Sequence, residues 1–138
     1  MKHNWIPLKR VGQIEFESPI DGYVESGLLV EEPELHDDEI GYKAYRLYGG
    51  DGTTVYTEND RVDDVLCDEE CIYEGLNVIG LSFDQFVRIF GPPNEGPEVF
   101  EMSDGPQEVY QFDDHGAQVW FEDGSVVTVI CSALLEED

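Results

Sequence analysis

The sequence contains three cysteines, a residue type used both as a nucleophile and as a metal ligand. Cys67 and Cys71 are separated by three residues, which is a loose spacing for a zinc-binding pair, and no second pair follows. A four-ligand site would also need His36 or His115. An odd number of cysteines argues against a disulfide framework. We therefore predict no metal site and expect Cys67 and Cys131 to be small buried core residues.

Catalysis by a cysteine requires a thiolate, which forms most easily beside a histidine or in a positive environment. Cys67 and Cys71 instead flank Asp68, Glu69 and Glu70, whose negative charge disfavours a thiolate. The sequence also lacks a Gly-x-Ser-x-Gly elbow, a phosphate-binding loop and a dinucleotide fingerprint. Pairs of carboxylates could serve a glycosidase, but 32 acidic residues make chance pairs unavoidable. We predict no catalytic residues, no cofactor and no enzymatic activity.

The charge of the chain restricts its partners. It has 32 Asp and Glu against 7 Lys and Arg, a net charge of −25. With 41% hydrophobic residues the chain can still bury a core, so it is not a disordered polyanion. Binding to nucleic acid or to an anionic membrane needs a basic surface, which this composition excludes. An electropositive protein is the partner that we expect.

Two segments concentrate the carboxylates. Residues 31–39 (EEPELHDDE) read as a loop, and residues 60–74 (DRVDDVLCDEECIYE) span a strand end and the loop after it. Either segment could be merely a solvated surface. We predict that the second segment binds the partner, with two strand aromatics as anchors. The predicted binding residues are Asp60, Asp63, Asp64, Asp68, Glu69, Glu70 and Glu74, together with Tyr56 and Trp120.

A repeated sequence predicts the strands that must position these residues. VYTENDRVDDVLC (55–67) and VWFEDGSVVTVIC (119–131) share five identical positions. Extending the match outward aligns residues 45–56 with 109–120, so that each half reads strand, turn, strand, turn, strand. The turns at Asn59-Asp60 and Asp123-Gly124 predict hairpins.

A short helix is predicted before each set of strands. LSFDQFVRIFGPP (81–93) has Ser82 as N-cap, Gln85 completing a capping box, and Gly91 in the left-handed conformation after the helix. FESPIDGYVESG (16–27) has Ser18 as a possible cap and Pro19 at the first helical position. At an offset of 67 residues, the apolar positions of the two helices match.

These elements predict an α+β fold, a tandem repeat of a short helix plus a three-stranded antiparallel meander sharing one core or sheet. Residues 1–138 form a single domain of two pseudo-repeats, about 12–67 and 79–131. Exposed outer strands would allow a homodimer. The N-terminal MKHNWIPLKR lacks the apolar region of a signal peptide, and no 18-residue apolar run occurs, so we expect a cytoplasmic protein.

Three features carry a resemblance to a known family: NVIGLSFDQF, the Gly-Pro after a short helix, and VWFEDGSVVTVIC. The sequence resembles the small acidic cytoplasmic immunity proteins of bacterial polymorphic-toxin and contact-dependent inhibition systems. Its layout is also similar to that of β-lactamase inhibitor proteins. The first resemblance implies a stoichiometric inhibitor of a cognate basic toxin, expected to be a nuclease domain. It implies no catalytic residues.

Other functions fit the same sequence. A phage- or host-encoded nucleic-acid mimic would share the acidity but inhibit several DNA- or RNA-binding proteins. A hydrolase with a carboxylate pair would show a cleft with carboxylates of perturbed pKa. A structural or regulatory subunit could be acidic only for solubility.

Overall fold

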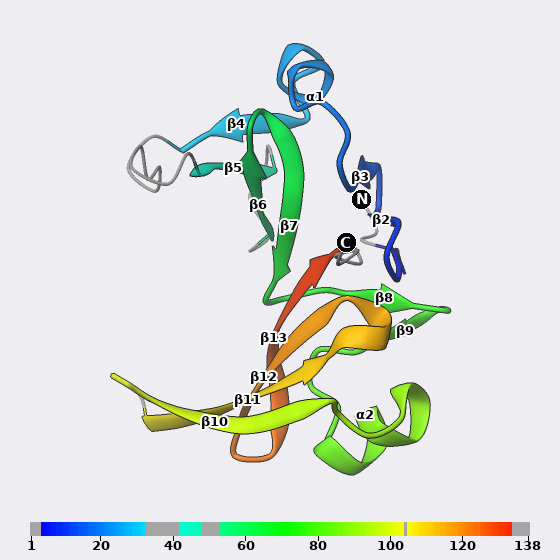
Figure 1. The fold of residues 1–138 in the computed structure, drawn as a ribbon, viewed down its shortest axis with the longest axis vertical. Helices are drawn as coiled ribbons and strands as arrows, with labels where there is room; N and C mark the ends of the chain where they lie inside the picture. Colours follow the sequence, from blue (N-terminus) through cyan, green and yellow to red (C-terminus); the bar gives the residue numbers. More distant parts are fainter. Residues whose placement is uncertain (1–3, 33–41, 48–52, 104, 134–138) are drawn as a thin grey trace, which may run out of the picture.

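The computed structural model describes residues 4–32, 42–47, 53–103 and 105–133. Within these residues, an eight-stranded antiparallel sheet dominates the fold, with two helices and two smaller sheets beside it (Figure 1). The α+β class is therefore confirmed. The strands of the large sheet, in spatial order, are β10 (Glu95–Met102), β11 (Gly105–Phe112), β12 (Ala117–Glu122), β13 (Ser125–Ser132), β7 (Arg61–Cys67), β6 (Thr53–Glu58), β5 (Tyr42–Leu47) and β4 (Leu29–Glu31).

The remaining elements are short. The β1–β3 sheet and the β8–β9 hairpin consist of two-residue strands, and a 3-10 helix precedes β12. Their bounds are β1 (Trp5–Ile6), β2 (Arg10–Val11), β3 (Ile14–Glu15), α1 (Asp21–Glu25), β8 (Ile72–Tyr73), β9 (Leu76–Asn77), α2 (Phe83–Phe90) and η2 (Asp113–His115).

Each half of the large sheet has one strand more than the three predicted. Strands β4 to β7 follow α1, and strands β10 to β13 follow α2. The additional strands, β4 and β10, form the two edges of the sheet. Their sequences give little signal, because β4 has only three residues and β10 is exposed at every position, so burial does not alternate along it.

The two inner hairpins have the same register. Val55 pairs with Val65 in β6–β7, and Val119 pairs with Val129 in β12–β13. Each ladder shifts by one residue at the corresponding point, which is Asp63 in the first hairpin and Val127 in the second. Both two-residue turns adopt positive φ, as predicted for Asn59-Asp60 and Asp123-Gly124.

The predicted alignment of the strand before each hairpin is wrong by one residue. Val55 pairs with Tyr45, whereas Val119 pairs with Tyr110, so Tyr45 corresponds to Tyr110 rather than to Val109. The connection before β6 spans five residues (48–52) and the connection before β12 spans four (113–116). Because side chains alternate between faces, this one-residue difference decides which residues enter the core.

The two halves form one continuous sheet because β7 pairs with β13. Leu66 pairs with Ile130, with Cys67 opposite Val129 on one side and Val65 opposite Cys131 on the other. Leu66 and Ile130 occupy the same position in the repeated sequence. Around this pair the junction therefore has a local two-fold arrangement.

The hydrophobic core lies on one face of the large sheet. Figure 1 shows α2, the β8–β9 hairpin and the β1–β3 sheet on this side. The ring of Phe90 lies 4.4 Å from that of Phe86, 4.7 Å from Tyr73 and 5.3 Å from Trp5. These aromatics join the apolar strand residues in one buried cluster. The side chains of this covered face are mainly valine, cysteine and phenylalanine.

The two helices differ in how well the sequence predicts them. Ser82 accepts a hydrogen bond from the backbone of Gln85, whose side chain bonds back to the Ser82 amide, so the capping box is confirmed. Gly91 has a positive φ of 85°, but its ψ of 178° is extended rather than left-handed. The first helix is shorter than predicted.

Ser18 does not cap α1. The N-cap is Ile20, and the Ser18 hydroxyl donates instead to the Glu15 carbonyl at 2.6 Å and bonds the Tyr23 hydroxyl. Pro19 precedes the helix and forms a bridge to Arg61. Because this bridge ties the chain to β7 at Pro19, the helix can begin only after that residue, and it has little more than one turn.

Replacing Gly116 by alanine should destabilise the fold by about 3 kcal/mol or more. Gly116 has a φ of 62°, and an added Cβ would collide with the Ser132 carbonyl and lie 2.7 Å from Leu8. Gly124→Ala is the control, because Gly124 also has positive φ but nothing lies within 4 Å of its Cβ position. It should cost about 1 kcal/mol. Urea unfolding compares them, and equal losses would show that the Gly116 contact is unimportant.

Candidate functional site

The second face of the large sheet is not covered by any helix or strand among the described residues (Figure 1). Burial alternates along the central strands, so residues between the core positions stay partly exposed. Residues that pair directly across strands project to the same face. The strand pairings define this open face as Thr54, Tyr56, Asp64, Leu66, Gln118, Trp120, Thr128 and Ile130.

The centre of the open face is apolar. Leu66 and Ile130 pair at the junction of the two halves, and Tyr56 and Trp120 hold matching positions on either side. The Trp120 ring stacks on Phe100 with a centroid distance of 5.2 Å, and its Nε1 donates to Gln118 at 2.9 Å. Phe100 is itself 38% exposed, so the apolar surface extends onto the edge strand. Aromatic side chains held in this way are preorganised for contact.

Asp64 gives one end of the open face an unusual electrostatic character. It pairs with Tyr56 in β6 and with Ser132 in β13. Burial, followed by the charges of Asp63 and Glu58, raises the pKa of Asp64 from 3.8 to about 6. At neutral pH this carboxylate is therefore ionised at a cost that a nearby cation would remove.

A hollow adjoins Asp64. It has a volume of about 270 Å³, and four of its lining side chains are carboxylates. Because these carboxylates come from three separate segments, the fold itself assembles the negative charge. The lining residues are Glu17, Glu58, Val62, Asp63, Asp64, Ser132 and Ala133.

The structure brings together only part of the predicted binding set. Tyr56, Asp64 and Trp120 lie on the open face, and Asp63 lines the hollow beside it. Asp60 lies in the β6–β7 turn, where its carboxylate is 3.5 Å from the Lys43 ammonium.

The other predicted acidic residues lie elsewhere. Asp68, Glu69 and Glu70 belong to the connection that leaves β7 toward the covered side, and Glu74 lies in the β8–β9 turn (Figure 1). Consecutive positions in sequence therefore do not form one surface here, because the chain turns away from the sheet after Cys67. Residues 33–41, most of the first acidic segment, lie outside the described residues.

Sequence reasoning missed several contributors to this region. Leu66 and Ile130 were visible as a like-for-like pair in the repeated sequence, but only the β7–β13 pairing places them side by side. Glu17 and Glu58 join the hollow from segments that carry no acidic run. Phe100 lies on a strand that the sequence did not predict.

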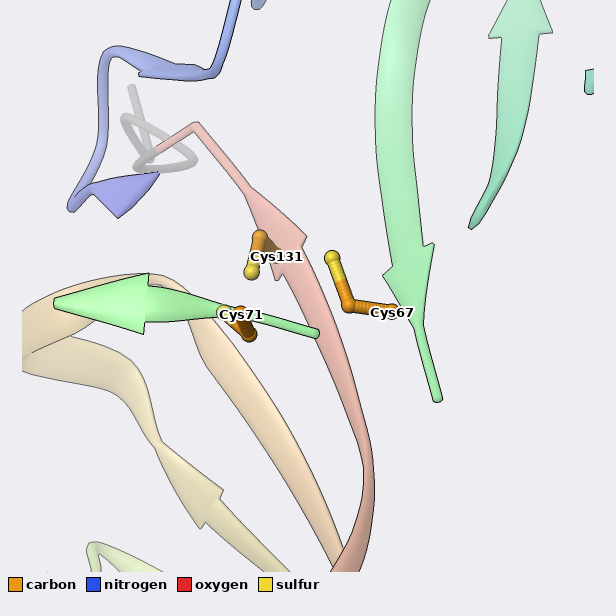
Figure 2. A group of neighbouring side chains, drawn as sticks. All are labelled: Cys67, Cys71 and Cys131. Carbon is orange, nitrogen blue, oxygen red and sulfur yellow. The ribbon is translucent and has the colours of Figure 1, made fainter. Parts of the chain in front are cut away.

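The cysteines form a separate group on the covered face (Figure 2). Cys67, Cys71 and Cys131 are all fully buried, and their sulfur atoms lie within 4.8 Å of one another. The expectation that Cys67 and Cys131 are buried core residues is confirmed. His115 lies against Phe90, with a ring distance of 5.0 Å, and is not among the residues that converge with these sulfurs. His36 lies outside the described residues.

The environment of Cys71 and Cys131 keeps these two thiols protonated. Burial, assisted by hydrogen bonds with Cys67 and Cys71, raises the pKa of Cys131 well above its usual value. At Cys71 the hydrogen bond with Cys131 lowers the pKa, but the bond with Cys67 and burial outweigh it, so the pKa is raised. Nucleophilic catalysis by these thiols is therefore disfavoured.

Comparison with family models, with curated proteins and with solved structures gives no match to this chain. None of the helices in the described part of the chain is long and apolar enough to cross a membrane. The functional argument therefore depends on the geometry of the open face and the hollow.

Asp64→Asn should stabilise the protein at pH 8 but not at pH 4. The folded-state pKa of Asp64 is raised, so stability falls as pH rises from about 4 to 6, and the penalty is complete above that range. The full shift would correspond to nearly 3 kcal/mol, but solvent reaches this carboxyl, and about 1 kcal/mol is expected. Urea unfolding at both pH values measures the difference.

Asp123→Asn is the matched control for this prediction. It removes the same charge from an exposed hairpin turn whose positive φ asparagine also tolerates. Its effect should be small and similar at the two pH values. An equal gain from both variants at pH 8 would mean that overall charge, rather than the site of Asp64, sets the pH dependence.

Proposed function

We propose that this protein binds a basic protein through the open face and acts as its stoichiometric inhibitor, in the manner of a toxin-immunity protein. The observation that carries the proposal is the position of Asp64. Its ionised carboxylate lies at the rim of an uncovered apolar surface and beside an acid-lined hollow. A lysine or arginine of the partner that enters this hollow would lower the pKa of Asp64 and gain a charge-assisted hydrogen bond.

The open face has the anatomy of a protein interface. Tyr56, Trp120 and the Leu66–Ile130 pair supply a centre that can exclude water, and carboxylates supply a charged rim. A net charge of −25 steers a basic partner toward the protein. Steering raises the association rate, whereas the aromatic centre limits dissociation.

The nature of the expected partner follows from charge. A nuclease must present a basic groove to hold a phosphate backbone, and an acidic protein can occupy that groove. This supports a nuclease toxin as the target, in agreement with the resemblance of the sequence to immunity proteins. A second copy of the chain is less favoured at the β10 edge, where Glu95, Glu98 and Glu101 would face the same residues.

We also propose that the chain is a tandem repeat, with four strands rather than three after each helix. The shared register and bulge of the inner hairpins support this. The segments before the helices make matching backbone bonds: Glu17 donates to Val62, and Gly80 donates to Val126. At this point the two halves are offset by 63 residues, not by the 67 that the helix alignment predicted.

The function is tested by capturing partners from the producing bacterium and washing with increasing salt. A single basic protein that stays bound near 0.3 M salt, where the screening length is about 6 Å, is expected. Adding this protein back to its own activity assay should give complete inhibition at one equivalent. A set of unrelated basic proteins released together by salt would favour the nucleic-acid mimic instead.

Two variants test the interface with that partner. Trp120→Ala should raise the Kd about 30-fold, as loss of an aromatic hot spot does. Asp63→Lys combined with Asp64→Lys should slow association and flatten its salt dependence. Surface plasmon resonance at several salt concentrations separates these effects.

The control reverses Glu69 and Glu70 to lysine. This pair makes the same change in net charge, but it lies on the connection after β7, away from the open face. It should change association only slightly. If it weakens binding as much as the Asp63 and Asp64 reversals, the open face is not the interface.

A further inference from the structure

The three buried sulfur atoms meet at the junction of the two halves. Cys67 ends β7, Cys131 lies in the neighbouring strand β13, and Cys71 precedes β8, so each comes from a different segment (Figure 2). Cys67 and Cys131 occupy the same position in the repeated sequence and lie on the covered face. Cys71 has no such counterpart, and its approach turns a pair of thiols into a group of three.

The spacing of the sulfurs suits one shared central atom. With bonds near 2.3 Å from a central atom to each sulfur, neighbouring sulfurs are about 3.8 Å apart in a tetrahedral site and somewhat closer in a three-coordinate pyramid. The three sulfurs here lie within 4.8 Å of one another, so a small inward movement of the side chains is enough. A disulfide could join only two of them.

Burial determines the charge of an acceptable ligand. All three cysteines are 0% exposed, and a net charge left in such a position is costly. Three thiolates around zinc carry one negative charge and leave its fourth position open, and around copper(I) they carry two. Three thiolates around a trivalent centre are neutral. The −25 charge of the chain further disfavours an anionic complex.

We propose that Cys67, Cys71 and Cys131 form a three-thiol site for one trivalent thiophilic metalloid of the arsenite class. In water at neutral pH, arsenic(III) is present as the small neutral acid As(OH)₃. Three As–O bonds break and three As–S bonds form, and each thiol proton leaves with a hydroxide as water. The products are As(SR)₃ and three waters, with no change in oxidation state and no charge on either side.

Entry to the site requires a local opening of the connection after β7. The Cys71 amide donates to Asn77 Oδ1 at 3.0 Å, and the Cys71 carbonyl accepts from Val78 at 2.8 Å. Asn77 ends the β8–β9 hairpin and Val78 follows it, and this hairpin has only two residues in each strand. Such a small unit can open without unfolding the large sheet. Binding then ties this connection to β7 and β13.

The test incubates the reduced full chain with arsenite, with zinc chloride in a parallel sample. Native mass spectrometry should show one arsenic per chain and no retained zinc after dialysis. Thiol titration after denaturation in acid should find all three thiols protected. Thermal unfolding should shift upward with arsenite, because a ligand that binds the folded protein more tightly than the unfolded chain stabilises it. Absence of arsenic uptake, or protection of only two thiols, would overturn the proposal.

Cys71→Ala is the discriminating variant, because it removes one thiol and keeps the Cys67–Cys131 pair. Its affinity for arsenite should fall at least about tenfold. Unchanged affinity would show that two thiols suffice and would overturn the three-thiol site. Displacement of arsenite by zinc from the unmodified chain would also overturn the proposal, because it would show that the site prefers a divalent metal. If the variant does not fold, the thiol count on the unmodified chain decides.

Discussion

The pairing of β7 with β13 is the interaction on which the rest of the structure depends. It makes one sheet from two four-stranded halves, and among the described residues it leaves only β4 and β10 as edges. A three- or four-stranded sheet with one short helix has little core of its own. Through Val65 and Val129, the junction brings the strands of both halves into one buried cluster. The edges that would otherwise pair with other chains are used internally.

The junction also has two chemically different sides. Toward the core it presents valine and cysteine, and toward solvent it presents Leu66 and Ile130. Strand alternation alone produces this division. The covered side must hold the fold together against the repulsion of a −25 charge, and the aromatic packing around Phe86 and Phe90 contributes to this. The side chains on the open side are not part of this packing, so their identities can differ according to the partner that we propose.

The sequence predicted what depends on local pattern. The capping box at Ser82 and both positive-φ turns follow from neighbouring residues, and the structure confirms them. The edge strand β10 could not be predicted, since its exposed residues show no alternation. Ser18 was assigned as a cap, but its bonds to Glu15 and Tyr23 belong to a turn. There, the bridge from Pro19 to Arg61 outweighs helix propensity.

The candidate site could be predicted only in part for a related reason. A run of carboxylates in sequence is not a surface, and the chain leaves the sheet directly after Cys67. The hollow instead combines Asp63 and Asp64 with Glu17 and Glu58, which are distant in sequence. Register, rather than composition, selects its members.

Equivalent backbone positions carry different side chains in the two halves, so the two ends of the open face are not alike. Asp64 pairs with Tyr56, and at the matching position Thr128 pairs with Trp120. The bulge residue is Asp63 in one hairpin and Val127 in the other. One end of the face therefore adjoins the acid-lined hollow, while the other carries the Trp120–Phe100 stack, with Glu98 as the carboxylate beside it on β10. A symmetric surface would accept a partner in two orientations, whereas this one favours a partner whose basic and apolar groups lie in a single order.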